Sequence, residues 1–520
     1  MNARRFLAVV LAVALLLLSL GLGGWWWVLQ RSPLQLQRQS LTVPRAARFM
    51  SRQAPLGLFV FTDGQQPVAY ARAVAPTRQR REAAATVAAL RDGAFAAAGL
   101  DYGQELAGWL GPEIGLGLVG GADDPAARGW LLALRSRDGD GARRFLQRFW
   151  QSRSLAGADL QISSYRGMGL ISGRGSVEGG ASVPLATALI NDDLVLIASG
   201  RGVLEQALDV SQLDELNLAA SPAFQAAVQR LGQGSALLTA RAEGLRAWLG
   251  LPADGASDVR SVVAALRPQR TALELEALLE RGGEGDPWQA HLDPQRGAAL
   301  LAGLQGDSDS LALLQDPAHW PPLLEPLLQR WLAGAAGPLP PLLVAADPGA
   351  LLWSEATSGW LVGTAADQPA VDALEPALAQ RGLIGAPLAL ADHGPLRVWT
   401  TLTAARKGSS ELQAELAGVR AADGPQAWWA ANLAALTEQR GGHQPPRQRL
   451  AQVEALDWPT APLQWAVGAK PAGQLLQSWR PWRLLAGLAA QPLTPSVKGL
   501  ALAVQPDGSD LQLRARLDLG

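Results

Sequence analysis

The sequence contains no cysteine in 520 residues. Disulfides, thiolate metal ligands, cysteine nucleophiles and a lipid-modified cysteine anchor are therefore excluded. Histidine is also scarce, and the four histidines lie too far apart along the chain to form a zinc motif. They are His291, His319, His393 and His443. We therefore expect no metal and no cofactor.

Charged residues are also few, at 18% of the chain compared with about 25% in typical soluble domains. The formal net charge is −1, so the chain lacks the basic field by which proteins bind nucleic acid. Hydrophobic residues make up 48% and the mean hydropathy is +0.07. This apolar excess must lie in a core, on a partner surface or in a bilayer, and nucleic acid is not an expected partner.

Catalytic motifs are absent as well, since neither G-x-S-x-G nor the phosphate-binding loop G-x-x-x-x-G-K-[ST] occurs. The stretch Gly115–Gly120 fits G-x-G-x-x-G, but Asp123 and Asp124 follow it where a dinucleotide site needs a helix N-terminus. The stretch Asp138–Gly141 resembles the start of a calcium loop, but Ala142 follows where that loop needs an oxygen ligand. We predict no catalytic, cofactor-binding or metal-binding residue.

The N-terminal segment is strongly apolar and carries no charge from Phe6 to Val28. As a helix it would measure roughly 35 Å, which spans the ~30 Å hydrocarbon core of a bilayer. Arginines precede this run and tryptophans end it, as expected for groups at the headgroup level. Residues 1–30 are therefore predicted to be a transmembrane signal anchor. The predicted membrane-interface residues are Arg4, Arg5, Trp25, Trp26 and Trp27.

A cleaved signal peptide is the alternative interpretation of this segment, but the apolar run is long for one and no A-x-A site follows. Arginines flank the helix on both sides, so charge alone does not set its orientation. A short tail with two arginines is typical of a signal anchor whose body lies outside the cytoplasm, in a periplasm or lumen. Residues 31–50, with Gln35, Gln37 and Gln39, are expected to form a short stalk.

The remainder of the chain reads as two diverged copies of one unit, residues 51–282 and 295–520. Gly129–Leu132 in the first copy corresponds to Gly359–Val362 in the second, and a helix-like run and a strand follow each. Each copy is expected to open with a strand, at 54–59 and at 297–302. The Gly/Pro-rich stretch between the copies marks their boundary.

Each copy ends with a predicted pair of strands. The pairs are 261–267 with 272–279, and 497–505 with 511–517, with turn-forming residues between the partners. Apolar and polar residues alternate from Leu511 to Leu517, which indicates a strand with one solvated face. These patterns predict an α+β fold: two tandem diverged repeats of antiparallel β-sheets, with helices packed on one face, after one transmembrane helix.

Several of these stretches together resemble a known family. They are Pro44–Met50, Trp109–Leu116, Gly129–Leu134 and Asn191–Gly200. With the N-terminal anchor, they resemble the uncharacterised membrane-anchored proteins, mainly cyanobacterial, of domain of unknown function family 3352 (DUF3352). The resemblance implies a periplasmic or thylakoid-lumen setting. It supplies no activity and no catalytic residue.

The 19 tryptophans are the remaining anomaly. Trp130 and Trp360 occupy matching places in the two copies, which favours a core role. Tryptophans often anchor protein interfaces, and two clusters in the second copy are a possible partner surface. These clusters are Trp428 with Trp429, and Trp479 with Trp482.

We therefore expect a single-pass membrane protein without catalytic activity. It would bind or assemble a membrane protein complex, or hold an apolar ligand, beside the lipid bilayer that its N-terminal helix enters. A membrane-surface hydrolase with an unrecognised site and a structural envelope protein are the alternatives.

Overall fold

The computed structural model describes residues 32–520 except 121–128, 156–158, 177–181, 250–258, 284–292, 318–319, 321–338, 347–348, 391–393, 405–411 and 442–447. The predicted anchor, with Arg4, Arg5, Trp25, Trp26 and Trp27, lies outside the described residues. Within the described ranges, no helix has the length and apolar character needed to cross a membrane.

The described elements divide into two runs along the chain. The first run is β1 (Leu56–Val60), α2 (Gln66–Val74), α3 (Arg80–Ala96), β2 (Leu110–Val119), β3 (Gly129–Ser136), α4 (Gly139–Leu155), β4 (Gln161–Tyr165), β5 (Met168–Ser176), β6 (Ser182–Ile190), β7 (Leu194–Ala198), α5 (Arg201–Gln212), α6 (Pro222–Leu231), β8 (Ala236–Arg241), α7 (Ala242–Leu249), β9 (Val259–Gln269) and β10 (Ala272–Arg281).

The second run is α8 (Pro294–Gly303), β11 (Ser310–Gln315), α10 (Leu339–Ala345), β12 (Ala350–Ala356), β13 (Gly359–Ala365), α11 (Val371–Gln380), β14 (Leu383–Leu390), β15 (Gly394–Ala404), β16 (Leu412–Asp423), β17 (Gln426–Ala430), α12 (Leu433–Gly441), α13 (Gln448–Glu454), β18 (Leu463–Gly468), α14 (Ala469–Ser478), α15 (Arg480–Leu488), β19 (Val497–Asp507) and β20 (Asp510–Leu519).

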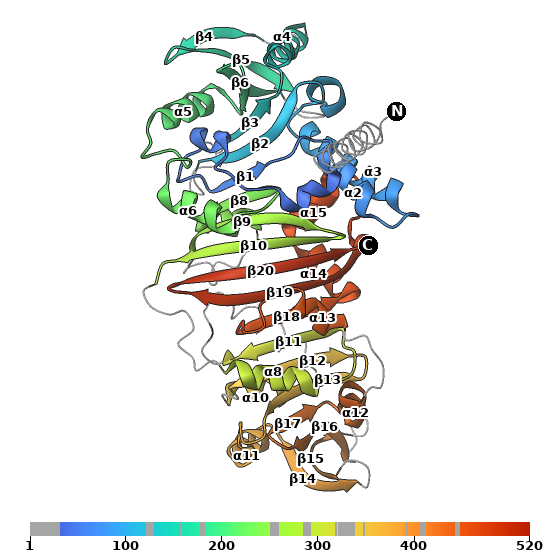
Figure 1. Cartoon of the computed structure of the whole chain (residues 1–520). Coiled ribbons are helices and arrows are strands. Elements are labelled where there is room, and N and C mark those ends of the chain that lie inside the picture. Colours follow the sequence, from blue (N-terminus) through green and yellow to red (C-terminus); the bar gives the residue numbers. More distant parts are fainter. Residues whose placement is uncertain are drawn as a thin grey trace, which may run out of the picture.

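The strands of the described residues form one continuous antiparallel sheet of 20 strands, stacked along the length of the molecule (Figure 1). Their spatial order is β4-β5-β6-β7-β3-β2-β1-β8-β9-β10-β20-β19-β18-β11-β12-β13-β17-β16-β15-β14. Every pairing from β1 to β10 recurs in the same order from β11 to β20. The chain is therefore α+β with a large antiparallel sheet, as the alternating patterns predicted.

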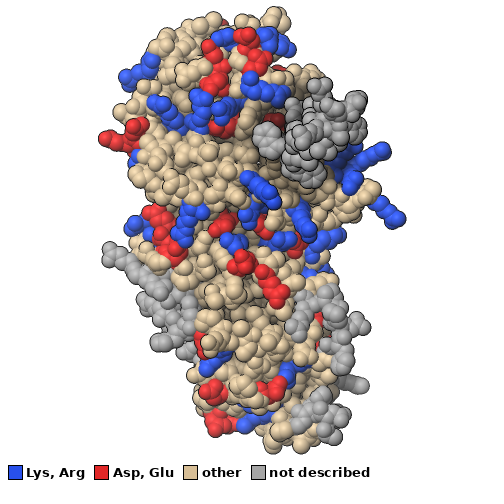
Figure 2. All heavy atoms as spheres, viewed as in Figure 1, with Lys and Arg blue, Asp and Glu red and all other residues tan. Residues whose placement is uncertain are grey.

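The two runs join where β10 pairs with β20, from Ala272 opposite Asp518 to Leu279 opposite Leu511. Ion pairs cross this seam on one face: Arg514 Nη2 lies 3.1 Å from Glu276 Oε2, and Arg516 Nη1 lies 2.9 Å from Glu274 Oε1. Figure 2 shows charges of both signs in a band across the middle of the molecule. The seam thus combines backbone pairing with charge pairing.

Helices cover both faces of the sheet, so the expectation of helices on one face only is wrong. In β19, Leu500 and Leu502 pack with the cluster that contains Leu476 of α14. The alternate residues Ala501 and Ala503 pack with Val453 of α13. Successive side chains of a strand point to opposite faces, so α13 and α14 lie on opposite sides of the sheet.

Two further expectations need correction. Residues 33–50 do not form a free stalk, because Leu36 and Phe49 are buried and the Ala46 amide donates to Glu113 Oε1 at 2.9 Å. The predicted opening strand at 297–302 is instead part of helix α8, which Asp293 caps by accepting a hydrogen bond from the Arg296 amide at 3.0 Å. A six-residue apolar run suits either element, and the cap decides for the helix.

Candidate functional site

Large aliphatic side chains are exposed together on β14, β15 and β16, at one end of the sheet. Ile384, Leu388, Leu402 and Leu416 are 53%, 36%, 51% and 42% exposed. In the strand register, Ile384 lies opposite Thr400, which lies opposite Leu416, while Leu402 lies opposite Ala414. Residues directly opposite each other share a face, and so do alternate residues of one strand. Leu388 is four residues after Ile384, and Leu402 is two residues after Thr400, so all four side chains lie on one face. We call these four residues and the sheet surface between them the docking face.

The opposite face is closed in the middle of β15, beside β17 and helix α11. Trp399 of β15 is buried and stacks on Trp429 of β17, with ring centroids 5.2 Å apart. Leu374 and Leu378 of α11 pack into the same cluster. Beyond Leu383, however, the edge strand β14 is exposed on both faces, so this backing supports β15 and not the whole edge of the sheet.

The docking face carries almost no charge among its described positions. Strand β14 has no charged residue. Arg397 of β15 lies opposite Pro387, in the alternate register, and forms an ion pair with Glu375 of α11 behind the sheet. Asp423 lies at the far end of β16 and pairs with Arg440 of α12. The surface is thus uncharged and largely apolar, with Thr400 between Ile384 and Leu416.

In the first run, helix α5 packs on β3, β6 and β7, and its side chains reach β4 and β5. Leu204, Ala207 and Leu208 of α5 are buried against Leu170 of β5 and Ala188 of β6. The Tyr165 hydroxyl of β4 donates to Asp209 Oδ2 of α5 at 2.7 Å, and this hydrogen bond raises the pKa of Tyr165. An amphipathic helix therefore already rests on this kind of surface once in the molecule.

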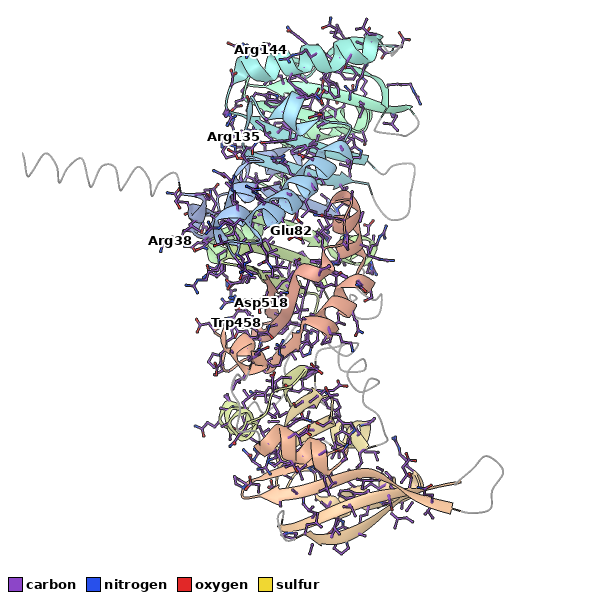
Figure 3. All side chains as sticks on the ribbon, turned by 90° about the vertical axis from the view of Figure 1, so that its right-hand side faces the viewer. Arg38, Glu82, Arg135, Arg144, Trp458 and Asp518 are labelled. Atoms are coloured by element: carbon purple, nitrogen blue, oxygen red, sulfur yellow. The ribbon has the colours of Figure 1, made fainter. Side chains whose placement is uncertain are left out.

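The helix in the equivalent place of the second run, α12, packs on β12, β13 and β17. Strands β15 and β16 have 11 and 12 residues, whereas β5 and β6 have 9 each. Figure 3 shows these longer strands reaching out at the lower end of the molecule. The docking face results from long strands beside a short covering helix.

The predicted tryptophan surface is largely wrong. Trp428, Trp429 and Trp482 are only 0%, 1% and 8% exposed, because they fill the core on both sides of the sheet. Trp479 alone is exposed, at 42%. The indoles supply core volume, and the exposed apolar surface consists of aliphatic residues, which the tryptophan pattern did not predict. The uncharged run Leu383–Leu390 was the available signal.

The other motifs have structural roles in the described chain. Gly115 and Gly117 lie inside β2, which pairs with both β1 and β3, so they do not form a phosphate loop. Asp138 pairs with Arg144 of α4, with Arg144 Nη2 3.3 Å from Asp138 Oδ2. No group of three metal-ligating side chains occurs among the residues that the structure describes.

Groups with a shifted pKa are spread over the described chain, and two of them lie near each other. Burial lowers the pKa of Arg420 and, separately, of Arg449, which lie on β16 and α13. Burial also raises the pKa of Tyr70, whose hydroxyl donates to the Arg270 carbonyl at 2.9 Å. Burial raises the pKa of Glu355, and Glu355 and Arg449 both interact with Asp309, whereas Arg420 and Tyr70 lie at separate packing sites.

Fold and surface together define an α+β protein built on one long antiparallel sheet, with an uncovered apolar face at one end. A family model described as "Protein of unknown function (DUF3352)" matches residues 10–301. This match spans more than half of the chain, so the protein belongs to that family, as the sequence motifs indicated. No curated protein matches the chain.

Solved structures with a partial likeness exist. The structures of crystal forms I and III of TP0453 are 11% and 10% identical to the chain, with TM-scores of 0.27 and 0.26. The aligned region spans 51% of this chain and 88% of the form I chain. For form III the shares are 52% and 91%. Likeness at this level carries no argument about fold or function.

Proposed function

We propose that the protein is a membrane-anchored, extracytoplasmic binding or assembly factor for a membrane protein complex, and that it acts without catalysis. The observation that carries this proposal is the docking face, which stays open where its counterpart in the first run is covered by α5. Monomeric proteins rarely expose contiguous apolar surface without a partner.

The occupant that fits best is an amphipathic helix of a partner protein. Helix α5 provides the precedent, because it places Leu204, Ala207 and Leu208 on the sheet at helical spacing. Addition of a strand to the edge of β14 fits less well, since Pro387 in the middle of that strand has no N–H to donate. The partner would therefore lie on the face of the sheet.

The anchor and the external location belong to the same proposal. Residues 1–30 would be the transmembrane anchor, and the bilayer the second partner. The described chain packs from residue 33 onward, so that segment would hold the body close to the bilayer. A partner within the same membrane would then meet the docking face at high effective concentration.

We also propose that residues 51–282 and 295–520 are diverged copies of one unit. The recurrence of the strand pairings supports this, as do Trp130 and Trp360 at the second positions of β3 and β13. In this proposal, the second copy lengthened its outer strands and lost the cover that α5 gives the first. The change would have converted a core surface into a binding surface.

The test is affinity purification of the full-length protein from its native membrane, with Leu402→Lys/Leu416→Lys compared with wild type. We expect a stoichiometric partner with wild type and at least about a tenfold loss with the double variant, because binding would bury two unpaired charges. Leu155→Lys, at another highly exposed leucine far from the docking face, should keep the partner. Equal recovery with all three proteins would refute the proposal.

A further inference from the structure

Three adjoining cavities lie in the first run, between the sheet and the helices α5 and α6. Their volumes are about 540, 470 and 380 Å³, and all three are bordered by Ser51 in the segment before β1. In Figure 1 the green helix α6 lies beside β8 and β9, and α5 lies beside β3. The first cavity lies within the ~300–1,000 Å³ range of small-molecule sites.

The first cavity has an apolar wall and reaches the seam between the two runs. Leu218, Phe224, Val263 and Leu278 line it, and all four belong to the core cluster beneath α6. Asp510 and Leu511 of β20 line its far end. A ligand here would contact elements of both runs, with an apolar wall on one side and a polar wall of similar extent on the other.

Arg241 is the exceptional residue of this region. It ends strand β8 and lines both the first and the third cavity. Leu237 of the same strand belongs to the cluster beneath α6. Arg241 lies four residues after Leu237, and alternate residues of a strand share a face, so the Arg241 side chain is on the cavity side of the sheet. Its backbone N–H donates to the Pro55 carbonyl at 3.1 Å. Among the described residues, its guanidinium forms no ion pair and no hydrogen bond.

The other charged groups around the first cavity have partners. Arg52 donates to the backbone carbonyls of Asn217 at 3.1 Å and of Asp214 at 2.7 Å. Arg230 pairs with Asp507, and Glu280 Oε2 accepts a hydrogen bond from the Ser261 hydroxyl at 2.6 Å. Asp510 Oδ1 accepts from the Arg281 amide at 3.0 Å.

Glu243 and Arg52 each line a cavity together with Arg241. Glu243 lines the third cavity, without an ion pair to Arg241 in the described chain. Arg52 uses two of its donors on neutral carbonyls, so its positive charge is not offset by a carboxylate. Arg241 and Arg52 thus face the first cavity as two guanidinium groups without a carboxylate partner.

From this arrangement we infer that the first cavity binds a single-chain amphiphile with an anionic head. The Arg241 guanidinium donates charge-assisted hydrogen bonds to the head, and the chain lies along Phe224, Val263 and Leu278. A guanidinium matches both carboxylate and phosphate oxygens, so a fatty carboxylate and a lysophospholipid phosphate share the required chemistry. This inference is independent of the docking face, because the cavity lies beside the central strands β8 to β10 and the docking face lies at one end of the sheet.

The test uses the full-length protein in neutral-lipid nanodiscs, with empty nanodiscs subtracted. Binding of oleate, oleoyl lysophosphatidate and the uncharged oleyl alcohol is measured by displacement of a fluorescent fatty acid. We expect saturable binding of an anionic ligand and at least about tenfold weaker binding of the alcohol, because a hydrogen bond to a charged group is lost. A preference for lysophosphatidate over oleate would identify phosphate as the head, and the reverse preference would identify carboxylate.

Two variants test separately how the cavity binds the anionic head and the apolar chain of the ligand. Arg241→Gln should weaken the anionic ligands about tenfold and leave oleyl alcohol unchanged, whereas Ala227→Phe, on the cavity wall, should weaken all three. Arg148→Gln, at an exposed arginine of α4, is the matched control and should change nothing. The inference is overturned if wild type shows no saturable binding, or if Arg241→Gln leaves the ratio of anion to alcohol affinity unchanged.

Discussion

At the scale of single residues, close backbone approaches fix where the two runs of the chain meet. Gly93 of α3 lies against Leu488 of α15, and a Cβ atom at Gly93 would overlap the Leu488 carbonyl oxygen. Both positions are helical, so the glycine is required by the short distance between the helices and not by its φ angle. A single sequence could not reveal this, because Gly93 reads as an ordinary weak point in a helix.

We therefore predict that Gly93→Ala destabilises the protein by about 1–3 kcal/mol through overpacking. Gly487→Ala is the matched control, because a Cβ there meets nothing within 4 Å and alanine favours the helix by about 0.5–1 kcal/mol. Denaturant unfolding followed by circular dichroism measures both changes. Equal stability of the two variants would contradict the close helix contact.

A second prediction at this scale concerns the three tyrosines, all of which have a raised pKa in the folded chain. Burial is the main cause for Tyr70 and Tyr102, and the hydrogen bond to Asp209 is the main cause for Tyr165. A raised folded pKa gives stability that is complete below the unfolded pKa of about 10 and is lost as pH rises through the folded pKa.

Ultraviolet titration should therefore place tyrosine ionisation at higher pH in the folded protein than in denaturant, and stability should fall above about pH 10. Tyr165→Phe should remove one of the shifted groups and leave the other two in place. Coincident titration curves in the folded and unfolded states would show that these environments are wrong.

At the scale of elements, the sequence predicted hairpins well and isolated apolar runs poorly. The hairpins β9–β10 and β19–β20 are confirmed, because their strands alternate and turn formers separate them. The run at 297–302 has no such alternation, and it forms part of α8. Burial of Trp428 and Trp429 could not be predicted either, since adjacent strand residues face opposite sides and both sides are covered.

Strands β5 and β15 hold equivalent places in the two runs, but Leu170 of β5 is buried beneath a helix, whereas Leu402 of β15 is exposed. Leucine-to-alanine substitutions at these two positions should therefore change the free energy of unfolding by different amounts. Leu170→Ala on covered strand β5 should cost about 2–5 kcal/mol, because the leucine is fully buried beneath α5. Leu402→Ala on uncovered strand β15 should cost no more than about 0.5 kcal/mol in the purified protein. Thermal unfolding compares the two, and a large loss for Leu402→Ala would mean that the chain covers its own docking face.

At the scale of the whole molecule, the sheet runs without interruption through the β10–β20 seam. Sequence alone predicted two units but not their continuous pairing, because seam contacts such as Glu276 with Arg514 join positions that are remote along the chain. The α3–α15 contact bridges the same two runs on one face. Stability should accordingly be shared between them.

We predict one cooperative unfolding transition for the body, with the calorimetric and van't Hoff enthalpies in agreement. Arg516→Met at the seam should lower the midpoint without splitting the transition, because it removes one of the partners of Glu274 and one of the partners of Asp518. Two transitions in the wild-type protein would show that the runs are separate folding units.

In the proposed function, a partner covers the docking face in the membrane. The absence of cysteine permits a direct measurement, since Leu416→Cys and Leu155→Cys each introduce the only thiol of the chain. We predict that alkylation of Leu416→Cys is at least about tenfold slower in native membranes than in the purified protein, because a bound partner shields it, while Leu155→Cys reacts alike in both. Equal relative rates at the two positions would contradict the claim.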